Sequence, residues 1–332
     1  MEKMSRISIR RRQLTLALVA FGAAPLTRAQ APARVGWLSL HSAGMYHEVT
    51  SRGFVKGLRE GGYEEGKNLV FVKRSADGDL RKLPALAREI VDSKVDVMFA
   101  PAKPMADAAW YASRSIPTVI ATVTDPVAVQ YANSLARPGK HITGVTTANA
   151  ELIGKRLQLL TELLPGLKRV GTFIDEGLLA SCEEEMILMD KAAAKLGLTV
   201  VRLNVTAFNP DLESAIKQAL TAKVQAVVTV PMTSNLDITD RIAVYANKYR
   251  IPFVHDVPQF ADVGLAIYGP DFEDIFRRAG NYVARILKGE KPAEMAIEEP
   301  RQFKFIVNLK AAKQLGIAVP QSVLLRADEV IR

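Results

Sequence analysis

Short apolar runs rich in β-branched residues alternate along the chain with longer segments that repeat apolar residues at helical spacing. The alternation begins at Val35 and predicts parallel strands joined by crossover helices. The first series of predicted strands comprises residues 35–40, 69–73, 95–100, 118–123 and 142–145. The second comprises residues 170–174, 199–204, 226–230, 253–255 and 265–268. We therefore expect an α/β protein with two doubly wound parallel-sheet lobes.

An internal repeat indicates that the two lobes are built alike. The run at 95–101 and the run at 226–231 both end in proline, and each leads through a helix with a Tyr-Ala pair. The helices are followed by Ile116-Pro117 in the first copy and Ile251-Pro252 in the second. The shared order of elements favours two similar lobes over a short-period repeat.

The last part of the chain predicts a hinge. An acidic stretch at 271–274 opens a long helix that ends before Gly289, and the segments 300–309 and 323–326 flank a closing helix. We expect the chain to cross between lobes near Thr146, Tyr268 and Phe303, which gives a three-strand hinge. The predicted domains are a leader at 1–29, lobe one at 30–145 plus 269–302, and lobe two at 146–268 plus 303–332.

The first residues have the layout of a secretory signal peptide. Arg10-Arg11-Arg12 precedes an apolar core at 14–24, and Thr27-Arg28-Ala29 forms a cleavage site with a small residue. The apolar core is too short to span a bilayer as an anchor. We expect cleavage near Ala29 and a periplasmic product, exported by the general secretory route or, given Arg11-Arg12, by the twin-arginine route.

Composition removes several classes of function. The net charge is +9, and loss of residues 1–29, with six basic and one acidic residue, leaves 38 basic against 34 acidic residues, or +4. This scattered charge argues against a nucleic-acid surface. The lone Cys182 excludes an internal disulfide. The histidines show no i, i+4 metal spacing, and glycine-rich nucleotide loops and nucleophile elbows are missing from the sequence, so neither enzyme nor cofactor is expected.

Several motifs together resemble a known family. They are the glycine-rich helix at 53–63, Thr124-Asp125-Pro126-Val127, the stretch 137–145, Tyr268-Gly269-Pro270-Asp271 and the helix end at 287–292. With these motifs the chain resembles the periplasmic substrate-binding proteins of ABC transporters with the type I fold, in the TrpX-like branch. The resemblance implies capture of a small molecule between two lobes and its delivery to a permease. The chain departs from the family at 174–177, where many members have an Asn-Pro pair.

Ligands of open α/β sheets bind beyond the carboxyl ends of the strands, where helix N-termini present free amides. This rule selects Ser39, His41, Ser42, Tyr46, Ala102, Lys103, Thr124 and Asp125 in lobe one, and Asp175, Glu176, Thr233 and Asp256 in lobe two. The resemblance implies an aromatic amino acid, for which Tyr46 and Tyr268 are available as aromatic walls. Hydroxyls and amides suit a carboxylate, and Asp125 or Glu176 suits an ammonium group.

Structural interpretations of these residues stay open beside the functional one. Ser42 and Thr233 are also typical helix caps, and Asp125 before Pro126 is a typical helix start. His41 and Lys103 also fit a solvated rim, and Tyr46 could pack under its loop. Asp256 could pair with a neighbouring base of lobe one.

These observations predict the solute-binding component of an ABC importer that closes about its hinge on an aromatic or other amino acid. A separate permease and ATPase would be its partners, and we expect a monomer that contacts the membrane only through the permease. Two alternatives stay open. One is a ligand-sensing receptor that presents its closed form to a membrane signalling partner, and the other is a hydrolytic enzyme that uses His255 beside Asp256.

Overall fold

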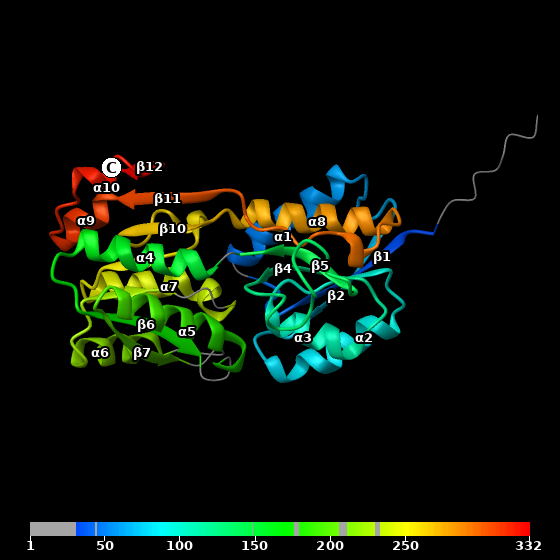
Figure 1. Cartoon of the computed structure of the whole chain (residues 1–332), viewed down its shortest axis with the longest axis horizontal. Helices are drawn as coiled ribbons and strands as arrows, with labels where there is room; N and C mark the ends of the chain where they lie inside the picture. Colours follow the sequence, from blue (N-terminus) through cyan, green and yellow to red (C-terminus); the bar gives the residue numbers. More distant parts are fainter. Residues whose placement is uncertain (1–30, 44, 148, 176–178, 206–210, 230–232) are drawn as a thin grey trace, which may run out of the picture. The chain divides into compact units, whose positions relative to one another are not determined.

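The strands of the protein form two sheets (Figure 1). The computed structural model describes residues 31–332 except 44, 148, 176–178, 206–210 and 230–232. The predicted leader lies outside the described residues. Each sheet carries its own helices and its own apolar core, as expected for an α/β protein with two lobes.

The first sheet is wholly parallel, with strand order β2-β1-β3-β4-β5. Its strands are β1 (Ala33–Ser39), β2 (Leu69–Ser75), β3 (Val97–Phe99), β4 (Thr118–Val123) and β5 (Ile142–Thr146). The helices of this lobe are α1 (Met45–Glu60), α2 (Leu83–Asp92), α3 (Lys103–Ala112) and α8 (Phe272–Leu287). Buried residues on both faces of the central strands explain why these strands read as continuous apolar runs.

The second sheet has the order β12-β11-β10-β9-β8-β6-β7. Its strands are β6 (Arg169–Asp175), β7 (Thr199–Val205), β8 (Ala226–Val228), β9 (Phe253–His255), β10 (Ala266–Pro270), β11 (Phe303–Asn308) and β12 (Glu329–Ile331). Its helices are α4 (Asn149–Leu163), α5 (Leu179–Lys195), α6 (Leu212–Thr221), α7 (Thr233–Lys248), α9 (Leu309–Leu315) and α10 (Gln321–Leu324). The predicted pattern needs one refinement, because β11 runs antiparallel to β10. Strand β10 runs out of this sheet toward lobe one, and β11 runs back into it from lobe one. The two neighbouring strands therefore point in opposite directions.

The internal repeat corresponds to equivalent units in the two sheets. The unit β3–α3–β4 and the unit β8–α7–β9 each place a helix between two adjacent parallel strands. The two lobes therefore share this part of their construction, as the sequence predicts.

The chain passes between the two sheets at three places. It leaves the first sheet after Thr146 at the end of β5, returns after Pro270 at the end of β10, and crosses again before Phe303 at the start of β11. The segment before β11 lies beside β5, since Thr146 N donates to the carbonyl oxygen of Glu298 at 2.8 Å. Three neighbouring connections thus join the lobes.

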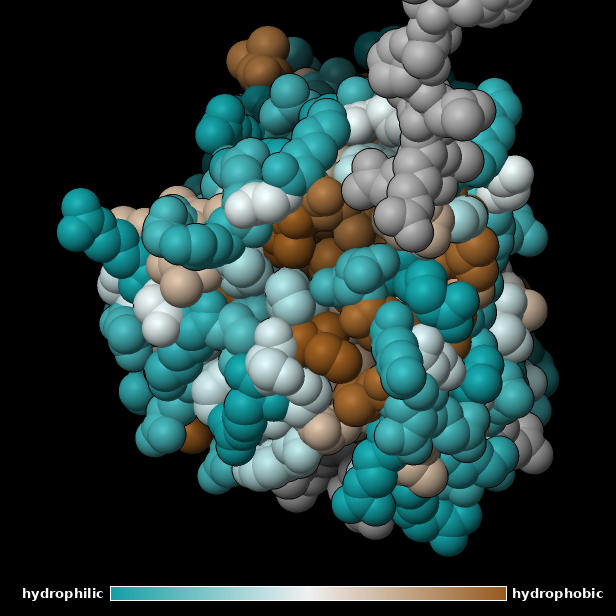
Figure 2. Space-filling model, turned by 90° about the vertical axis from the view of Figure 1, so that its right-hand side faces the viewer, coloured by the Kyte–Doolittle hydropathy of each residue, from teal (hydrophilic) through white to brown (hydrophobic). Residues whose placement is uncertain are grey.

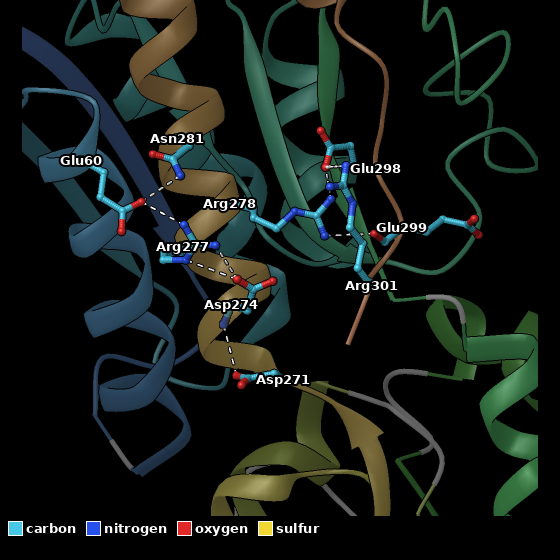
Figure 3. Close-up of polar contacts among 9 residues, drawn as sticks. All are labelled: Glu60, Asp271, Asp274, Arg277, Arg278, Asn281, Glu298, Glu299 and Arg301. Carbon is cyan, nitrogen blue, oxygen red and sulfur yellow. Dashed lines mark hydrogen bonds and ion pairs between the residues drawn. The ribbon is translucent and has the colours of Figure 1, made fainter. Parts of the chain in front are cut away.

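Helices α1 and α8 of lobe one pack at very short range because both carry glycine at the contact. A Cβ atom on Gly57 would lie 1.8 Å from the carbonyl oxygen of Arg277, and one on Gly280 would lie 2.2 Å from that of Phe54. Ion pairs flank the contact: Arg277 binds both Glu60 of α1, at 2.9 Å, and Asp274 of its own helix, at 2.6 Å (Figure 3). The glycine-rich motif at 53–63 is therefore a helix-packing surface.

The start of α8 confirms the predicted acidic cap. Asp271 precedes the helix, and its Oδ1 accepts a hydrogen bond from the backbone N–H of Asp274 at 3.2 Å (Figure 3). Farther along α8, Arg278 forms an ion pair with Glu298 of the segment beside β5. These contacts fasten α8 to lobe one at both sides.

Most apolar side chains lie in the cores. Figure 2 shows one face of the molecule, on which hydrophilic residues make up most of the surface and hydrophobic residues gather in between. The larger exposed apolar side chains of the described residues come from separate elements, among them Tyr111, Val244 and Leu325. Within the described residues, we find no helix of the length and hydropathy that crossing a bilayer requires.

Candidate functional site

The polar groups predicted for lobe one lie at one edge of its sheet. Strands β1, β3 and β4 are parallel neighbours, so their carboxyl ends meet at the same edge. Ser39 ends β1, Ala102 and Lys103 begin α3 after β3, and Thr124 directly follows β4. The structure thus brings these predicted residues to one edge of the sheet.

The loop after β1 is fastened to the loop after β2. The hydroxyl of Ser42 donates to Oδ1 of Asp77 at 3.1 Å, and the hydroxyl of Ser75 donates to the same oxygen at 2.8 Å. Burial lowers the pKa of the neighbouring His41 below its ordinary value, although the charge of Asp77 opposes this shift. Ser42 therefore has a structural role here, and His41 is a neutral hydrogen-bonding group at neutral pH.

A contact from the other lobe reaches the end of β4. The hydroxyl of Thr124 donates to Oε1 of Glu185, which lies on α5. Burial raises the pKa of Glu185, and the hydrogen bond from Thr124 opposes the shift. Burial also raises the pKa of Glu184, with help from the charges of Asp125 and Glu185. Three carboxylates from two lobes therefore gather at the end of β4.

Asp125 and Lys103 at this corner already have partners. Oδ1 of Asp125 accepts the backbone N–H groups of Val127 and Ala128, both at 2.9 Å, so this carboxylate caps a turn. The ammonium group of Lys103 pairs with Asp107 at 2.9 Å and acts on both glutamates of α5. The corner has more acidic than basic groups, which suits a ligand that carries an ammonium group.

Asp256 of lobe two follows β9 and is 1% exposed. Its Oδ1 accepts a hydrogen bond from the hydroxyl of Thr229 at 2.7 Å. The opposite charge beside it is the fully buried Arg156 of α4, a residue of the same lobe. Asp256 therefore lies beside a basic residue, as its structural interpretation predicts. The prediction of a base from lobe one is wrong, because Arg156 belongs to lobe two.

His255 beside Asp256 is held by the main chain on both ring nitrogens. Its Nε2 lies 2.9 Å from the carbonyl oxygen of Val263, and its Nδ1 lies 3.3 Å from the N–H of Val257. Burial lowers the pKa of His255 to about 4. Both nitrogens are thus used in packing the strand end, which leaves the hydrolytic alternative without a base at this position.

Tyr268 faces a pocket on the α4 side of β10. The pocket has a volume of about 380 Å³ and is lined by Lys155, Gln158, Leu159, Glu162, Tyr268, Phe303, Phe305, Arg326 and Asp328. The ring of Tyr268 packs edge-on against Phe305, and Nζ of Lys155 lies 5.9 Å from its centre. Its role as an aromatic wall beside the strand-end groups remains a prediction.

Other predicted positions lie wholly or partly outside the described residues. Glu176 belongs to 176–178, and the side chains of Tyr46, Asp175 and Thr233 are also outside the description, although their backbones belong to α1, β6 and α7. Over the described part of the chain, no three His, Cys, Asp or Glu side chains are placed to share a metal ion.

Two residues of the site escaped the sequence analysis. Glu185 lies within α5, in the acidic run 183–185, where no strand end points to it. Arg156 stands three residues after Ile153 and four before Leu160, so it occupies the apolar stripe of α4. A basic residue within an apolar helical stripe predicts a buried cation, so the sequence could have indicated Arg156.

Comparison with known proteins identifies the family. The family model for ABC transporter substrate binding proteins matches residues 40–331. The chain belongs to this family. This substrate-binding protein is 28% identical over 288 residues to a tyrosine-binding protein of Clostridioides difficile, with 85% of this chain and 81% of the relative covered.

Two crystal structures agree with this substrate-binding protein in fold. A conserved domain protein from Vibrio cholerae is 30% identical, with a TM-score of 0.82 and coverage of 90% of this chain and 99% of that one. An ABC domain from Streptococcus pneumoniae in complex with L-Trp is 25% identical, with a TM-score of 0.81 and coverage of 91% and 100%. The predicted family and the predicted α/β class with two lobes are confirmed.

Proposed function

We propose that the protein is the solute-binding component of an ABC importer and that its ligand is an amino acid with an aromatic side chain. Membership of the substrate-binding family supports the first part. The tyrosine-binding relative and the L-Trp complex of a similar structure support the second.

The contact between Thr124 and Glu185 carries the proposal for the site. It joins a strand end of lobe one to a helix of lobe two and brings a buried carboxylate to the corner where Asp125 and Glu184 also lie. An ammonium group would bind among these carboxylates through charge-assisted hydrogen bonds. The backbone amide of Lys103 at the start of α3 would receive the ligand's carboxylate, together with the hydroxyl of Ser39 once it leaves the carbonyl oxygen of Arg74 at 3.4 Å.

Binding would close the two lobes about their three connections. The moving bodies would be residues 30–145 plus 269–302 and residues 146–268 plus 303–332. A ligand must prefer the closed state by about 5.5 kcal/mol to shift the balance from 1:99 to 99:1. The protein itself would perform no catalytic step: a permease would recognise the closed rim, and a separate ATPase would supply the energy.

The chain would act in the periplasm as a monomer after cleavage near Ala29. A thermal-shift screen of the mature chain against the L-amino acids tests the ligand class. We expect L-tyrosine, L-tryptophan or L-phenylalanine to raise the melting temperature most, since a ligand at 100 times its Kd stabilises a protein by about 2.7 kcal/mol. The corresponding amines, which lack the carboxylate, serve as controls. A shift with sugars or purines and none with amino acids would refute the proposed ligand.

A further inference from the structure

A buried cation lies under α4. Arg156 is 0% exposed, and its Nη1 donates to the carbonyl oxygen of Tyr268 in β10 at 3.0 Å. Within the described residues, its Nε and Nη2 have no hydrogen-bond partner. Burial lowers the pKa of Arg156, and the negative charge of Asp256 opposes the shift. Asp256 is therefore the counter-charge of this guanidinium.

Asp256 is held by three elements at once. Its carboxylate accepts the hydroxyl of Thr229 beyond the end of β8 and lies beside the charge of Arg156 from α4. Its carbonyl oxygen touches the strand that leads to lobe one, because a Cβ atom on Gly269 would lie only 1.8 Å away. In the register of β9 with β10, His255 stands opposite Ile267, so Asp256 and Tyr268 are the next neighbours.

Apolar packing alone would be better served by another residue at position 156. Arg156 shares its stripe with Ile153, Leu157 and Leu160, all buried. A buried charge with unused donors costs several kcal/mol, and replacing a whole buried ion pair by apolar residues is often neutral or stabilising. Packing therefore does not explain why an arginine stands at position 156. Its contacts with Asp256 and with the carbonyl oxygen of Tyr268 do.

We propose that Arg156 is a positioning residue of the ligand site, which holds the carboxylate of Asp256 at the end of β9 and the carbonyl oxygen of Tyr268 in β10. The guanidinium of Arg156 then links Asp256, the group proposed to bind the ligand, to β10, the strand that leads into α8. The group that Asp256 receives is cationic, such as the ammonium of an amino acid. The ligand part rests on the proposed function, whereas the link to β10 does not.

The link to β10 can be tested without ligand in the variants R156M, D256N and R156M/D256N. The control is Q158M, on the exposed face of the same helix. We expect R156M to lower the melting temperature most and the double variant to recover most of that loss, because it leaves no lone buried charge. Amide hydrogen exchange over residues 267–271 should be at least tenfold faster in R156M and remain faster in the double variant, since both lack the bond to Tyr268. Unchanged exchange in R156M, or exchange restored by the second substitution, would overturn the proposal.

The ligand part is tested by titration calorimetry with L-tyrosine and L-tryptophan. We expect R156M, D256N and the double variant each to bind at least tenfold more weakly than wild type, with no further loss in the double variant. A double variant that regains both stability and wild-type affinity would show that the pair is merely structural. If R156M fails to fold, R156K keeps the charge and should bind with intermediate affinity. If wild type binds neither amino acid, the proposed ligand is wrong, and the exchange result still decides the role of Arg156.

Discussion

At the scale of single residues, Glu185 is a buried carboxyl group at the corner where the two lobes meet. Burial raises its pKa above the ordinary value of 4.5, so the folded protein holds this proton more tightly than the unfolded chain does. The stability that this proton gives is present below pH 4.5 and is lost as pH rises through the raised pKa. A cationic ligand would explain why a glutamate stands at a buried position that disfavours its charged form.

The variant E185Q should therefore be more stable than wild type at pH 7, with the difference vanishing below pH 4. Its affinity for an amino acid should fall more than tenfold, because a charge-assisted hydrogen bond is lost. Urea unfolding at both pH values and calorimetry measure the two effects. E183Q, on an exposed neighbour, is the control. Equal affinity in E185Q and wild type would remove Glu185 from the site.

Sequence patterns locate single site residues less well than they locate strands. The strand-end rule correctly places Ser39, Lys103 and Thr124 at one edge of the sheet, because parallel strands put their carboxyl ends together. It could not find Glu185, since the contact with Thr124 depends on how α5 packs against the other lobe, 61 positions along the chain. The rule also selects residues with a structural role. Asp125 stands at a strand end, but its carboxylate caps a turn.

At the scale of elements, the contact of α1 with α8 depends on glycine. The variant G57A would place a Cβ atom 1.8 Å from the carbonyl oxygen of Arg277 and force the helices apart. We expect a loss of roughly 1–3 kcal/mol in the free energy of unfolding, measured in urea.

The matched control is G154A in α4. Among the described residues, its Cβ atom would meet nothing closer than Ala192 Cβ at 4.0 Å. The variant should therefore be more stable by about 0.4–1 kcal/mol, because its unfolded chain is less flexible. Equal effects of the two substitutions would contradict the packing described for α1 and α8.

The elements themselves follow closely from the pattern of apolar positions. The strands at 118–123 and 253–255 have the predicted bounds, and most others differ by one or two residues. Two features were not predicted. The antiparallel sense of β11 depends on which lobe the chain comes from, and β12 is too short to show alternation.

At the scale of the whole molecule, the predicted leader at 1–29 makes the site of action testable. We expect N-terminal sequencing of the protein from its native periplasm to begin at Gln30, since Thr27-Arg28-Ala29 has the form of a cleavage site. Replacing Ala29 by a bulky residue should leave the precursor uncleaved. A cytoplasmic protein that retains Met1 would contradict export.

The central claim is that an amino acid binds at the acidic corner and that one lobe then closes on the other about their three connections. Small-angle X-ray scattering of the mature chain tests it most directly, with and without a saturating amount of the amino acid that gives the largest thermal shift. We predict a smaller radius of gyration with the ligand and a profile that fits two rigid bodies brought together. An unchanged profile at full occupancy would contradict the claim.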